Sequence, residues 1–464
     1  MRALFLILWL SAAASHAQWE SVGGGVSNGQ VTWLEWDTED ECLYVLGSMR
    51  WAGPDDLEVN GVTYWKDGLW HLMDGGVDHP FNGAVPFVHQ TIKYGGEHIV
   101  VGGFDSIGGN ELASRVARWT GNSWLPLDPI VAHDGNTYGL SVIDDELHLH
   151  GGFDTIADVP VQNWAIWNGQ EWRAGDTMGV FLDWSTREAI KFEDRIYVGG
   201  NFETSDGRND LLMKVGDEWV ELGPGLQGDC YVSDLEVYDG LLWVTGYFFS
   251  GAGNAATGVM AWDGEQWLDP FPQMELYGWG RSLTIANGKL YICGFMTAEG
   301  LPGTYQIAEY DGEQLCIRGG NQIVTTKVDA SPDTLYAITC DQIGCNEFGG
   351  LVVNHLMKMP LSWPADTCYA VVQGVAEQKA SGKWAAFPNP AQTTITLKGP
   401  SHFSGTCWLS ITDQTGRLVT SRRLVPTNGT ISLNVDDLAP GNYAARMTYD
   451  GGKAGGSTAF VVVP

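Results

Sequence analysis

The sequence is short of positive charge. Its 464 residues include 25 Lys and Arg against 56 Asp and Glu, which gives a net charge of −31. A surface this acidic repels phosphate backbones and anionic membranes, so no nucleic acid is expected as a partner. The excess of acidic residues is also typical of a protein that stays soluble after export.

The sequence lacks the short motifs that identify common enzyme and metal sites. It has no H-E-x-x-H, no P-loop and no C-x-x-C pair. These absences argue against the metalloproteases, P-loop proteins and zinc ribbons that carry such motifs. The sequence therefore predicts no catalytic residue and no metal ligand.

No apolar run is long enough to span a bilayer as a helix. The apolar stretch LFLILWL at 4–10 follows Arg2 and precedes the small residues around Ser15 and Ala17. This order is typical of a secretory signal peptide over 1–17, and we expect cleavage after Ala17. A buried N-terminal strand is the alternative interpretation.

Export would permit disulfide bonds among the eight cysteines. Cys340 and Cys345 are the candidate pair, because the residues between them have the composition of a short loop. The other cysteines cannot be paired from the sequence alone.

Glycine is abundant, with 61 residues, and it accompanies a repeated pattern of short strands. In the unit at 99–127, the apolar run IVVGGF leads through a polar loop to VARW, a Gly-Asn turn and SWLPL. The last aromatic residue of the unit recurs about every 48 residues, at Trp70, Trp124, Trp172, Trp219 and Trp267, with Leu315 in the same position. A further strand precedes each unit. Four short strands at this period are typical of a blade of a β-propeller.

The count of units gives seven blades over residues 18–363. The seventh unit, at 334–359, has no strand with the repeated Trp after it, whereas QWESVGGGV at 18–26 is a strand with Trp19 in that position. We therefore predict that the N-terminal strand completes the seventh blade, which removes free sheet edges. The alternative is that residues 361–363 supply this strand.

The pattern L-Y-V-G-G-x-F…W-D-G-x-x-W…L-G-x-G resembles the kelch and galactose-oxidase-like propeller repeats of secreted bacterial surface proteins. The resemblance covers about residues 18–362 and implies a propeller fold. It implies little about function, because propellers serve as binders, enzymes and scaffolds. The copper site of galactose oxidase, which needs His and Tyr ligands, cannot be placed in this sequence.

The C-terminal part follows a different pattern. Residues 364–384 show no strand periodicity and are interpreted as a linker. Residues 385–464 contain several short alternating strands, which predict a small Ig-like β-sandwich. The complete fold prediction is an all-β chain, with a seven-bladed β-propeller followed by this sandwich.

Three motifs occur in order within 385–464: F-P-N-P, D-x-T-G-R and L-A-P-G-N-Y. They resemble the type A C-terminal sorting domain of the type IX secretion system, with Gly441 expected to permit the turn before Tyr443. The motif residues are Pro388, Asn389, Pro390, Gly416, Gly441 and Tyr443. The resemblance implies export by the type IX secretion machinery of a Gram-negative bacterium, with release or attachment at the outer surface. A generic sandwich that binds a partner is the alternative.

Long loops indicate the candidate ligand-binding face. The connections on one face of the predicted propeller are tight hairpins, whereas those on the other face are long. The candidate binding residues on the long-loop face are Trp33, His133, Asp134, Trp184, Asp229, Tyr231, Trp279 and Arg281. Trp and Tyr beside acidic residues suit stacking on sugar rings. The alternative is that these aromatic residues wedge between blades.

Two patterns bear on metal ions. His148 and His150 share one face of a strand, and we interpret them as a neutral, hydrogen-bonded core pair because no acidic or Cys ligand is fixed nearby. The Asp-rich loop at 206–210 suggests Ca²⁺, but it lacks the spacing and the terminal Glu of the known calcium loop. No other cofactor is indicated.

Two functions remain open at this point. The first is a secreted or cell-surface propeller that binds a glycan or a surface protein without catalysis, which the long-loop face and the missing catalytic motifs favour. The second is a polysaccharide hydrolase or lyase whose acidic residues come from several blades. A structural role in a surface layer is a further alternative.

The sorting motifs predict that residues 384–464 fold separately and act as an export signal. A chain that ends near Gly382 should fold yet stay in the periplasm of its host. A fluorescent reporter followed by residues 365–464, behind a signal peptide, should reach the surface or the medium. Cell fractionation measures both outcomes, and a shortened chain that still reaches the medium would show that the signal lies elsewhere.

Overall fold

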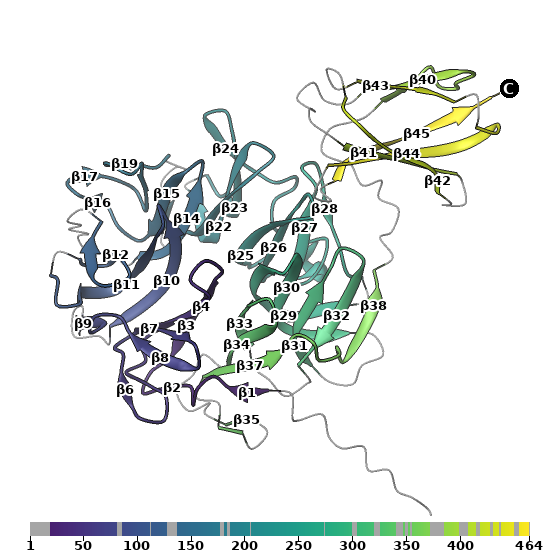
Figure 1. The fold of residues 1–464 in the computed structure, drawn as a ribbon. Coiled ribbons are helices and arrows are strands. Elements are labelled where there is room, and N and C mark those ends of the chain that lie inside the picture. Colours follow the sequence, from purple (N-terminus) through teal and green to yellow (C-terminus); the bar gives the residue numbers. More distant parts are fainter. Residues whose placement is uncertain are drawn as a thin grey trace, which may run out of the picture. The chain divides into compact units, whose positions relative to one another are not determined.

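The computed structural model is built from β-strands (Figure 1). It describes residues 19–463 except for 81–85, 112, 128–136, 177–180, 183–185, 205, 273, 299–303, 320–324, 340–346, 349–350, 353–354, 372–384, 399–406, 414–417, 427–429, 436–437 and 450–453. Within these described residues, the only helical element is the 3₁₀ turn η2 (Ser250–Ala252). No helix in the described part of the chain has the length and apolar character needed to cross a membrane.

The chain divides into two compact units. The first consists of Met1–Glu236, Trp243–Met260 and Trp267–Val371. The second consists of Val237–Leu242, Ala261–Gln266 and Val372–Pro464.

Seven antiparallel sheets of four or five strands follow one another along the described part of residues 20–370. The first three are β3 (Val31–Asp37), β4 (Cys42–Gly47), β7 (Val62–Lys66) and β8 (Leu69–Leu72); β10 (Phe87–Tyr94), β11 (Glu97–Ile107), β12 (Val116–Trp119) and β13 (Trp124–Pro126), with β9 (Val77–Pro80) beside β11; and β14 (Thr137–Ile143), β15 (Glu146–Gly151), β18 (Trp164–Trp167) and β19 (Trp172–Ala174).

The next three sheets have the same order. They are β21 (Thr186–Phe192), β22 (Arg195–Thr204), β23 (Asn209–Val215) and β24 (Glu218–Glu221), with β20 (Phe181–Leu182) beside β22; β25 (Tyr231–Tyr238), β26 (Leu241–Tyr247), β27 (Val259–Trp262) and β28 (Trp267–Leu268); and β29 (Met274–Ala286), β30 (Lys289–Ala298), β31 (Tyr305–Tyr310), β32 (Gln314–Arg318) and β38 (Thr367–Ala370).

The last sheet combines strands from both ends of the first unit. It consists of β33 (Thr325–Ala330), β34 (Thr334–Thr339), β37 (Leu356–Pro360) and β1 (Glu20–Ser21). Shorter ribbons lie in the connections: β2 (Val26–Ser27), β5 (Trp51–Ala52) and β6 (Leu57–Glu58); β16 (Thr155–Ile156) and β17 (Val159–Pro160); and β35 (Glu347–Phe348) and β36 (Leu351–Val352).

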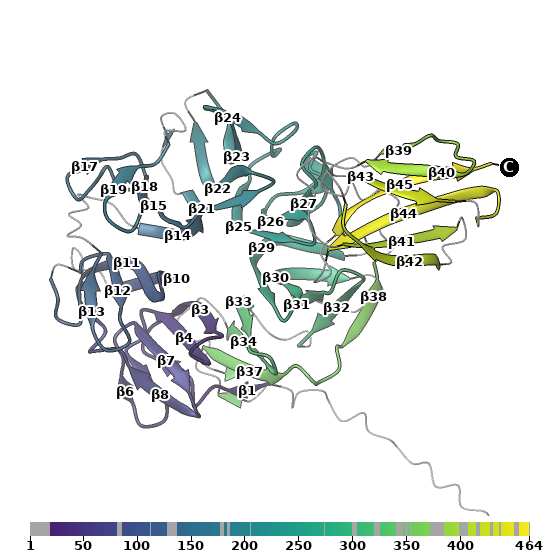
Figure 2. The same ribbon diagram turned by 45° about the horizontal axis from the view of Figure 1, so that its top comes forward.

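The first strands of the seven sheets are joined in series. Figure 2 shows β3, β10, β14, β21, β25, β29 and β33 around a common centre. At every junction a side chain of one first strand bonds the backbone of the next: Thr32 Oγ1 to Val88 O (2.6 Å), Gln90 to Leu140 N and O (2.8 and 3.1 Å), Ser141 Oγ to Ala189 N (3.1 Å), Glu188 Oε2 to Leu235 N (2.9 Å), Asp234 Oδ2 to Leu283 N (2.8 Å), Thr284 Oγ1 to Val328 O (2.8 Å) and Asp329 Oδ2 to Trp36 N (2.7 Å). We call these the inter-sheet hydrogen bonds. They form a closed series, because the last one returns to β3.

Six of the first strands carry a β-bulge at the same place, near the beginning of the strand. The glycine of the repeated motif explains its position. A Cβ on Gly102 would lie 2.1 Å from Phe87 O, and a Cβ on Gly47 would lie 1.9 Å from Gln30 O, so only glycine lets the two backbones approach at the bulge. We call this end of the first strands the bulge end, and the opposite end, with the tight turns, the hairpin end.

The hydrophobic core of the first unit lies between adjacent sheets. Leu34 and Val45 of the first sheet, for example, pack with Ile338 and Leu356 of the last. Strand β4 is buried at every position. Second strands of this kind are nearly continuous apolar runs because sheets cover both of their faces.

Four of the repeated tryptophans form a hydrogen bond to the preceding sheet. Their Nε1 groups donate to backbone oxygens near the end of that sheet: Trp70 to Gly23 (3.0 Å), Trp124 to Met73 (2.7 Å), Trp172 to Leu127 (3.0 Å) and Trp267 to Leu222 (3.0 Å). Trp19 makes the same bond to Gly319 O (3.1 Å) and is 5% exposed. Beside it, β1 pairs with β37 through Glu20 and Lys358.

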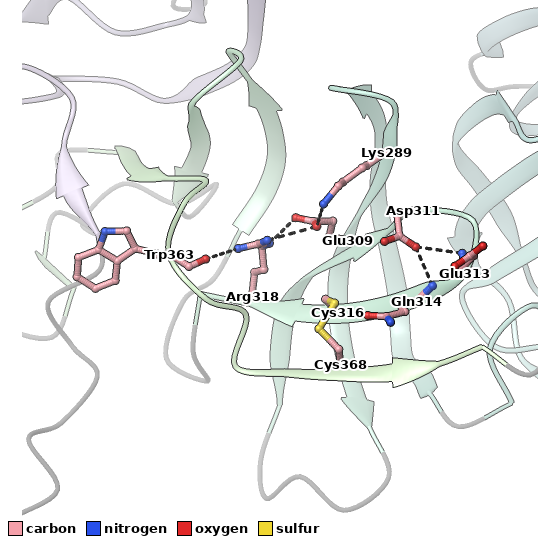
Figure 3. The surroundings of a disulfide bond; sticks show 9 residues. All are labelled: Lys289, Glu309, Asp311, Glu313, Gln314, Cys316, Arg318, Trp363 and Cys368. Atoms are coloured by element: carbon pink, nitrogen blue, oxygen red, sulfur yellow. Dashed lines mark hydrogen bonds and ion pairs between the residues drawn. A yellow bond between two sulfur atoms is a disulfide. The ribbon is translucent and has the colours of Figure 1, made fainter. Parts of the chain in front are cut away.

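The segment that the sequence suggested as a linker contains a strand. β38 pairs with β32, and Cys316 and Cys368, which face each other in this pairing, form a disulfide bond (Figure 3). The sequence could not identify this pair because 52 residues separate the two cysteines. The pair that we had expected, Cys340 and Cys345, lies outside the described residues.

A buried carboxylate lies in the same sheet as the disulfide (Figure 3). Glu309 is 3% exposed and forms ion pairs with Lys289 and Arg318. Burial by itself would raise the pKa of Glu309, but the hydrogen bonds from Arg318 and Lys289 lower it overall. Arg318 Nη1 also donates to Trp363 O (2.9 Å), which anchors the segment that leads into β38.

The C-terminal residues form two antiparallel sheets. They are β39 (Ala385–Phe387), β40 (Thr394–Lys398) and β43 (Thr430–Asn434); and β42 (Leu418–Leu424), β41 (Cys407–Asp413), β44 (Gly441–Tyr449) and β45 (Ala454–Val462). Ile395 and Ile431 from the first sheet share one hydrophobic core with Leu409, Met447 and Phe460 from the second.

The motif residues occupy distinct places in these sheets. Asn389 Oδ1 accepts a hydrogen bond from Val461 N (2.9 Å), so the F-P-N-P segment is fixed to the last strand, while Pro388 and Pro390 are exposed. Tyr443 donates its hydroxyl to Ala439 O (2.7 Å). Gly441 is the first residue of β44, where a Cβ would meet only contacts of 3.9 Å, so the expected steric need for glycine does not exist there. Gly416 lies outside the described residues.

Trp19→Ala tests the role of the N-terminal strand. We expect it to lower the free energy of unfolding of the first unit by about 3–5 kcal/mol, because it removes a buried aromatic side chain from the last sheet. Trp19→Phe keeps most of the packing and loses only the bond to Gly319 O, so it should cost less. Thermal and denaturant unfolding measure both, and unchanged stability of the Ala variant would show that β1 is not needed to complete the sheet.

Candidate functional site

The bulge gives each first strand one side chain outside the regular alternation. In six strands this residue is identified by the register shift: Thr32, His89, Tyr138, Arg187, Arg281 and Thr326. The inter-sheet hydrogen bonds align the first strands, so these residues gather at the bulge end. Bulges often redirect side chains in this way next to functional sites.

Two groups of aromatic side chains lie at the bulge end, one on the second and third sheets and one on the fifth. The ring contacts are Phe87 with His89 (4.7 Å between centroids), His89 with Tyr138 (5.4 Å), Tyr231 with Tyr247 (5.7 Å, stacked) and Tyr247 with Phe249 (4.9 Å). All of these rings are partly buried and partly exposed. We call them the aromatic arc.

Two cations lie over aromatic rings at the same end. Arg187 of β21 has its guanidinium carbon 5.5 Å from the ring centroid of Tyr231 in β25. Lys327 of β33 has its Nζ atom 3.8 Å from the ring of Trp33 in β3. Each contact joins two sheets and holds a positive charge at the bulge end.

Four carboxyl groups follow these residues in the first strands. Burial and the neighbouring Asp329 raise the pKa of Glu35 from 4.5 to about 8, and burial raises the pKa of Asp329 to about 6. Burial and the hydrogen-bonded Asp234 raise the pKa of Glu188 well above its usual value. Glu35 therefore holds a proton at neutral pH, and the pKa of Glu188 is shifted in the same direction.

Three of these four groups accept inter-sheet hydrogen bonds, and Glu35 does not. Among the described residues, the side-chain hydrogen bond of Glu35 comes from Trp33 Nε1, at 3.4 Å. Glu35 is therefore the one of these four carboxyl groups whose oxygens do not join two first strands.

The structure brings three of the eight predicted binding residues to the bulge end. Trp33 and Tyr231 contact the two cations, and Arg281 is the bulge residue of β29. Trp33 also packs against the core between the first and second sheets, so part of its ring acts as the wedge that we had considered. Asp229 is exposed just before β25.

The remaining predicted binding residues cannot be placed. The side chain of Trp279 lies outside the described part of the chain, as do His133, Asp134 and Trp184.

Most of the bulge-end residues were not predicted from the sequence, because the prediction considered only the long loops. These residues are Phe87, His89, Tyr138, Arg187, Tyr247, Phe249 and Lys327. Most of them lie in the strands themselves. An alignment of the first strands would have shown polar and aromatic residues at one shared position of an otherwise apolar repeat.

One group in the described part of the chain has the composition of a metal site. Ligand atoms of Asp37, Asp40 and His98 lie within 4.8 Å of one another at the hairpin end. Asp37 already accepts hydrogen bonds from His98 Nε2 (2.7 Å), Lys93 Nζ (2.8 Å) and the backbone N–H groups of Glu39 (2.8 Å) and Asp40 (2.9 Å). Burial favours a raised pKa for Asp37, yet these bonds lower it below its usual range. The group joins the first two sheets, and a metal ion would have to displace Lys93.

His148 and His150 are both buried. Burial lowers the pKa of His148 to about 4 and that of His150 to about 3, so both rings are neutral at neutral pH. His148 Nδ1 accepts a hydrogen bond from Trp164 Nε1 (3.1 Å). His150 has no hydrogen-bond partner among the described residues, so the expectation of a hydrogen-bonded pair is correct for His148 only.

The carboxylates of the Asp-rich loop bind separate donors of the protein. Asp206 accepts from Thr204 Oγ1 (2.6 Å) and Arg208 Nε (2.8 Å). Asp210 is buried and accepts from Cys230 Sγ (3.1 Å). The carboxylates of this loop are thus bound by other groups of the protein.

The variant Glu35→Gln tests whether Glu35 is protonated in the folded protein. The folded chain holds this proton up to about pH 8, whereas the unfolded chain releases it near the ordinary pKa of 4.5. The wild-type protein should therefore lose stability, relative to the Gln variant, as the pH rises through about 4.5 to 8. Melting temperatures of both proteins over this range measure the effect. Glu41→Gln, at an exposed position in the turn between β3 and β4, is the control. Parallel curves for wild type and Glu35→Gln would contradict the raised pKa.

Comparison with known families identifies the C-terminal domain. Residues 385–457 match the family described as "Secretion system C-terminal sorting domain". This domain directs secretion through the type IX system to the cell surface or the extracellular space in Bacteroidetes. A search of curated proteins finds no match for the chain.

Solved structures give distant matches to the fold. The chain is 11% identical to PorZ, an essential surface component of the type IX secretion system of Porphyromonas gingivalis, over 95% of this chain and 60% of that one (TM-score 0.39). It is 12% identical to the extracellular domain of BT4673 from B. thetaiotaomicron, over 96% and 59% (TM-score 0.43), and 12% identical to the β-propeller domain of the Trilobed protease from Pyrococcus furiosus, over 68% and 92% (TM-score 0.38). The chain thus spans about three fifths of the first two structures. These likenesses concern a β-propeller-like fold alone.

Proposed function

We propose that the protein is a seven-bladed β-propeller at the cell surface or in the medium, which binds a glycan at the bulge end without catalysing a reaction. In this proposal residues 1–17 are the signal peptide and residues 18–363 the propeller, with the N-terminal strand as the outer strand of the seventh blade. Residues 364–384 connect the propeller to an Ig-like sorting domain at 385–464. A surface protein is the alternative ligand.

The closed series of inter-sheet hydrogen bonds supports the propeller. The bond of Trp19 to Gly319 O repeats the bond that Trp124 and Trp172 make to their preceding sheets. A ring of sheets closed in this way is a rigid scaffold for the residues at its rim.

The aromatic arc is the observation that carries the binding proposal. Within each of its two groups the rings contact one another, and the groups come from three sheets. Partly exposed Tyr and His rings offer a flat apolar face together with a polar group, which suits the face of a sugar ring and its hydroxyl groups. A rigid platform of this kind binds without the entropy cost of ordering a loop.

Hydrolysis of a polysaccharide is the second candidate, and Glu35 is the reason to consider it. A protonated carboxyl group at neutral pH can act as a general acid. A hydrolase also needs a second carboxylate as base or nucleophile. Asp329, the acid that acts most strongly on Glu35, is already bound to Trp36 N (2.7 Å) and so serves the junction between sheets. We therefore favour binding over hydrolysis.

A glycan array probed with the mature protein tests the proposal. Tyr231→Ala removes one ring of the arc and should weaken binding about 10-fold, because stacking and apolar burial are lost. Tyr94→Ala is the matched control, since Tyr94 lies at the hairpin end of β10, where its hydroxyl donates to Asp145 O (3.2 Å). It should leave binding unchanged.

Each outcome of this test has a definite meaning. If no glycan is retained, or if Tyr94→Ala weakens binding as much as Tyr231→Ala, the proposed glycan-binding face is wrong. A reducing-sugar assay on the retained glycans separates the two functions. If the wild-type protein produces new reducing ends and Glu35→Gln does not, the function is hydrolysis and not binding alone.

A further inference from the structure

We propose that the ligand of the bulge end is an anionic polysaccharide, whose carboxylate or sulfate groups bind Arg187 and Lys327. This inference rests on the proposed glycan-binding function and specifies the class of glycan.

Neither Arg187 nor Lys327 forms an ion pair within the described part of the chain, although the charge of Lys327 acts on the nearby carboxyl groups of Glu35 and Asp329. Most cations in the described part of the first unit contact a carboxylate: Arg50, Lys93, Arg118, Arg173, Lys191, Arg208, Lys214, Lys289 and Arg318. Arg187 and Lys327 form no ion pair with any described residue, although the chain has 56 acidic residues for 25 basic ones. In so acidic a protein, a cation that forms no ion pair with a carboxylate is available to an anion from outside.

Both cations are held against aromatic rings. Lys327 Nζ lies 3.8 Å from the ring of Trp33, and the Arg187 guanidinium lies 5.5 Å from that of Tyr231. An aromatic ring restrains a cation without neutralising its charge. Arg187 is exposed, so its donors can reach a ligand. A sugar stacked beside either ring would bring its anionic substituent to the cation, and Arg pairs well with carboxylate and sulfate groups.

A further argument concerns the acidic groups nearby. Burial raises the pKa of Glu35 to about 8, and burial together with Asp234 raises that of Glu188. Glu35 is therefore neutral at pH 7 and does not repel an anion, whereas Asp329, whose pKa burial raises to about 6, keeps a negative charge that Lys327 partly offsets. Burial and the charge of Arg187 lower the pKa of His89 to about 4, so His89 is a neutral partner for sugar hydroxyl groups.

The net charge of the protein, −31, opposes binding of any polyanion outside a local site. The protein as a whole repels polyanions, so unspecific attraction cannot produce binding to them. Retention of an acidic polysaccharide would have to come from a local site, and it should weaken with rising salt concentration because exposed charges are screened.

The experiment compares neutral and acidic polysaccharides in matched pairs. The mature protein is tested for binding to galactan and polygalacturonate, and to dextran and dextran sulfate. We expect an acidic member to be bound at least about 10-fold more tightly than its neutral counterpart, as for hydrogen bonds to a charged group.

Charge-removing variants locate the site. Arg187→Gln and Lys327→Gln should each weaken binding of the acidic polysaccharide about 10-fold. Lys191→Gln is the matched control, because Lys191 is in the same strand as Arg187 but at the hairpin end, where it pairs with Asp144 (2.6 Å). It should leave binding unchanged, and melting temperatures confirm that all three variants fold.

The outcomes separate this inference from the proposed function. Retention of polygalacturonate alone identifies a carboxylate ligand, and retention of dextran sulfate alone identifies a sulfate ligand. Retention of the neutral members alone overturns the inference but leaves glycan binding in place. Retention of none of the four overturns the inference, and a glycan array without hits rejects the proposed function as well. An equal loss in Lys191→Gln would also overturn the inference, because the site would not be at the bulge end.

Discussion

The inter-sheet hydrogen bonds are the constraint on which the rest of the first unit depends. Each first strand is an edge strand of its sheet, so its outward N–H and C=O groups have no ladder partner. Side chains of the neighbouring first strand bond these groups, as Asp234 does for Leu283 N and Asp329 does for Trp36 N. Bonds of this kind give hydrogen-bond partners to backbone groups at the edges of neighbouring sheets. Removing one sheet from the ring would leave these groups unpaired.

This way of closing the ring shapes its chemistry. Several of the side chains that join the sheets are carboxyl groups, and burial raises the pKa of Glu188 and Asp329 as a result. The same alignment brings the bulges together and places Arg187 and Lys327 against aromatic rings of the next sheet. Architecture and candidate site therefore have one physical origin, the register of the first strands.

The features that recur from sheet to sheet could be predicted from the sequence. The period of the tryptophans and the apolar second strands depend on local burial, so they are visible in the chain, and Trp19 stands out by the same rule. Contacts between sheets are different, because they depend on register and on residues far apart in sequence. The contact of Arg187 with Tyr231 belongs to this class, and the disulfide of Cys316 with Cys368, although it lies within one sheet, also joins residues far apart in sequence. The strand β38 escaped prediction because four residues are too few to show a period.

Hydrogen exchange of the mature protein, measured with and without an acidic polysaccharide, tests the central claim most directly. The claim is that the ring of first strands binds its ligand at the bulge end. With polygalacturonate or dextran sulfate as the probe, amide groups at 31–35, 186–189 and 231–235 should exchange more slowly. Those of the hairpin ends at 144–145 and 193–194 should not change. Protection confined to the hairpin ends, or no protection with either probe, would contradict the account.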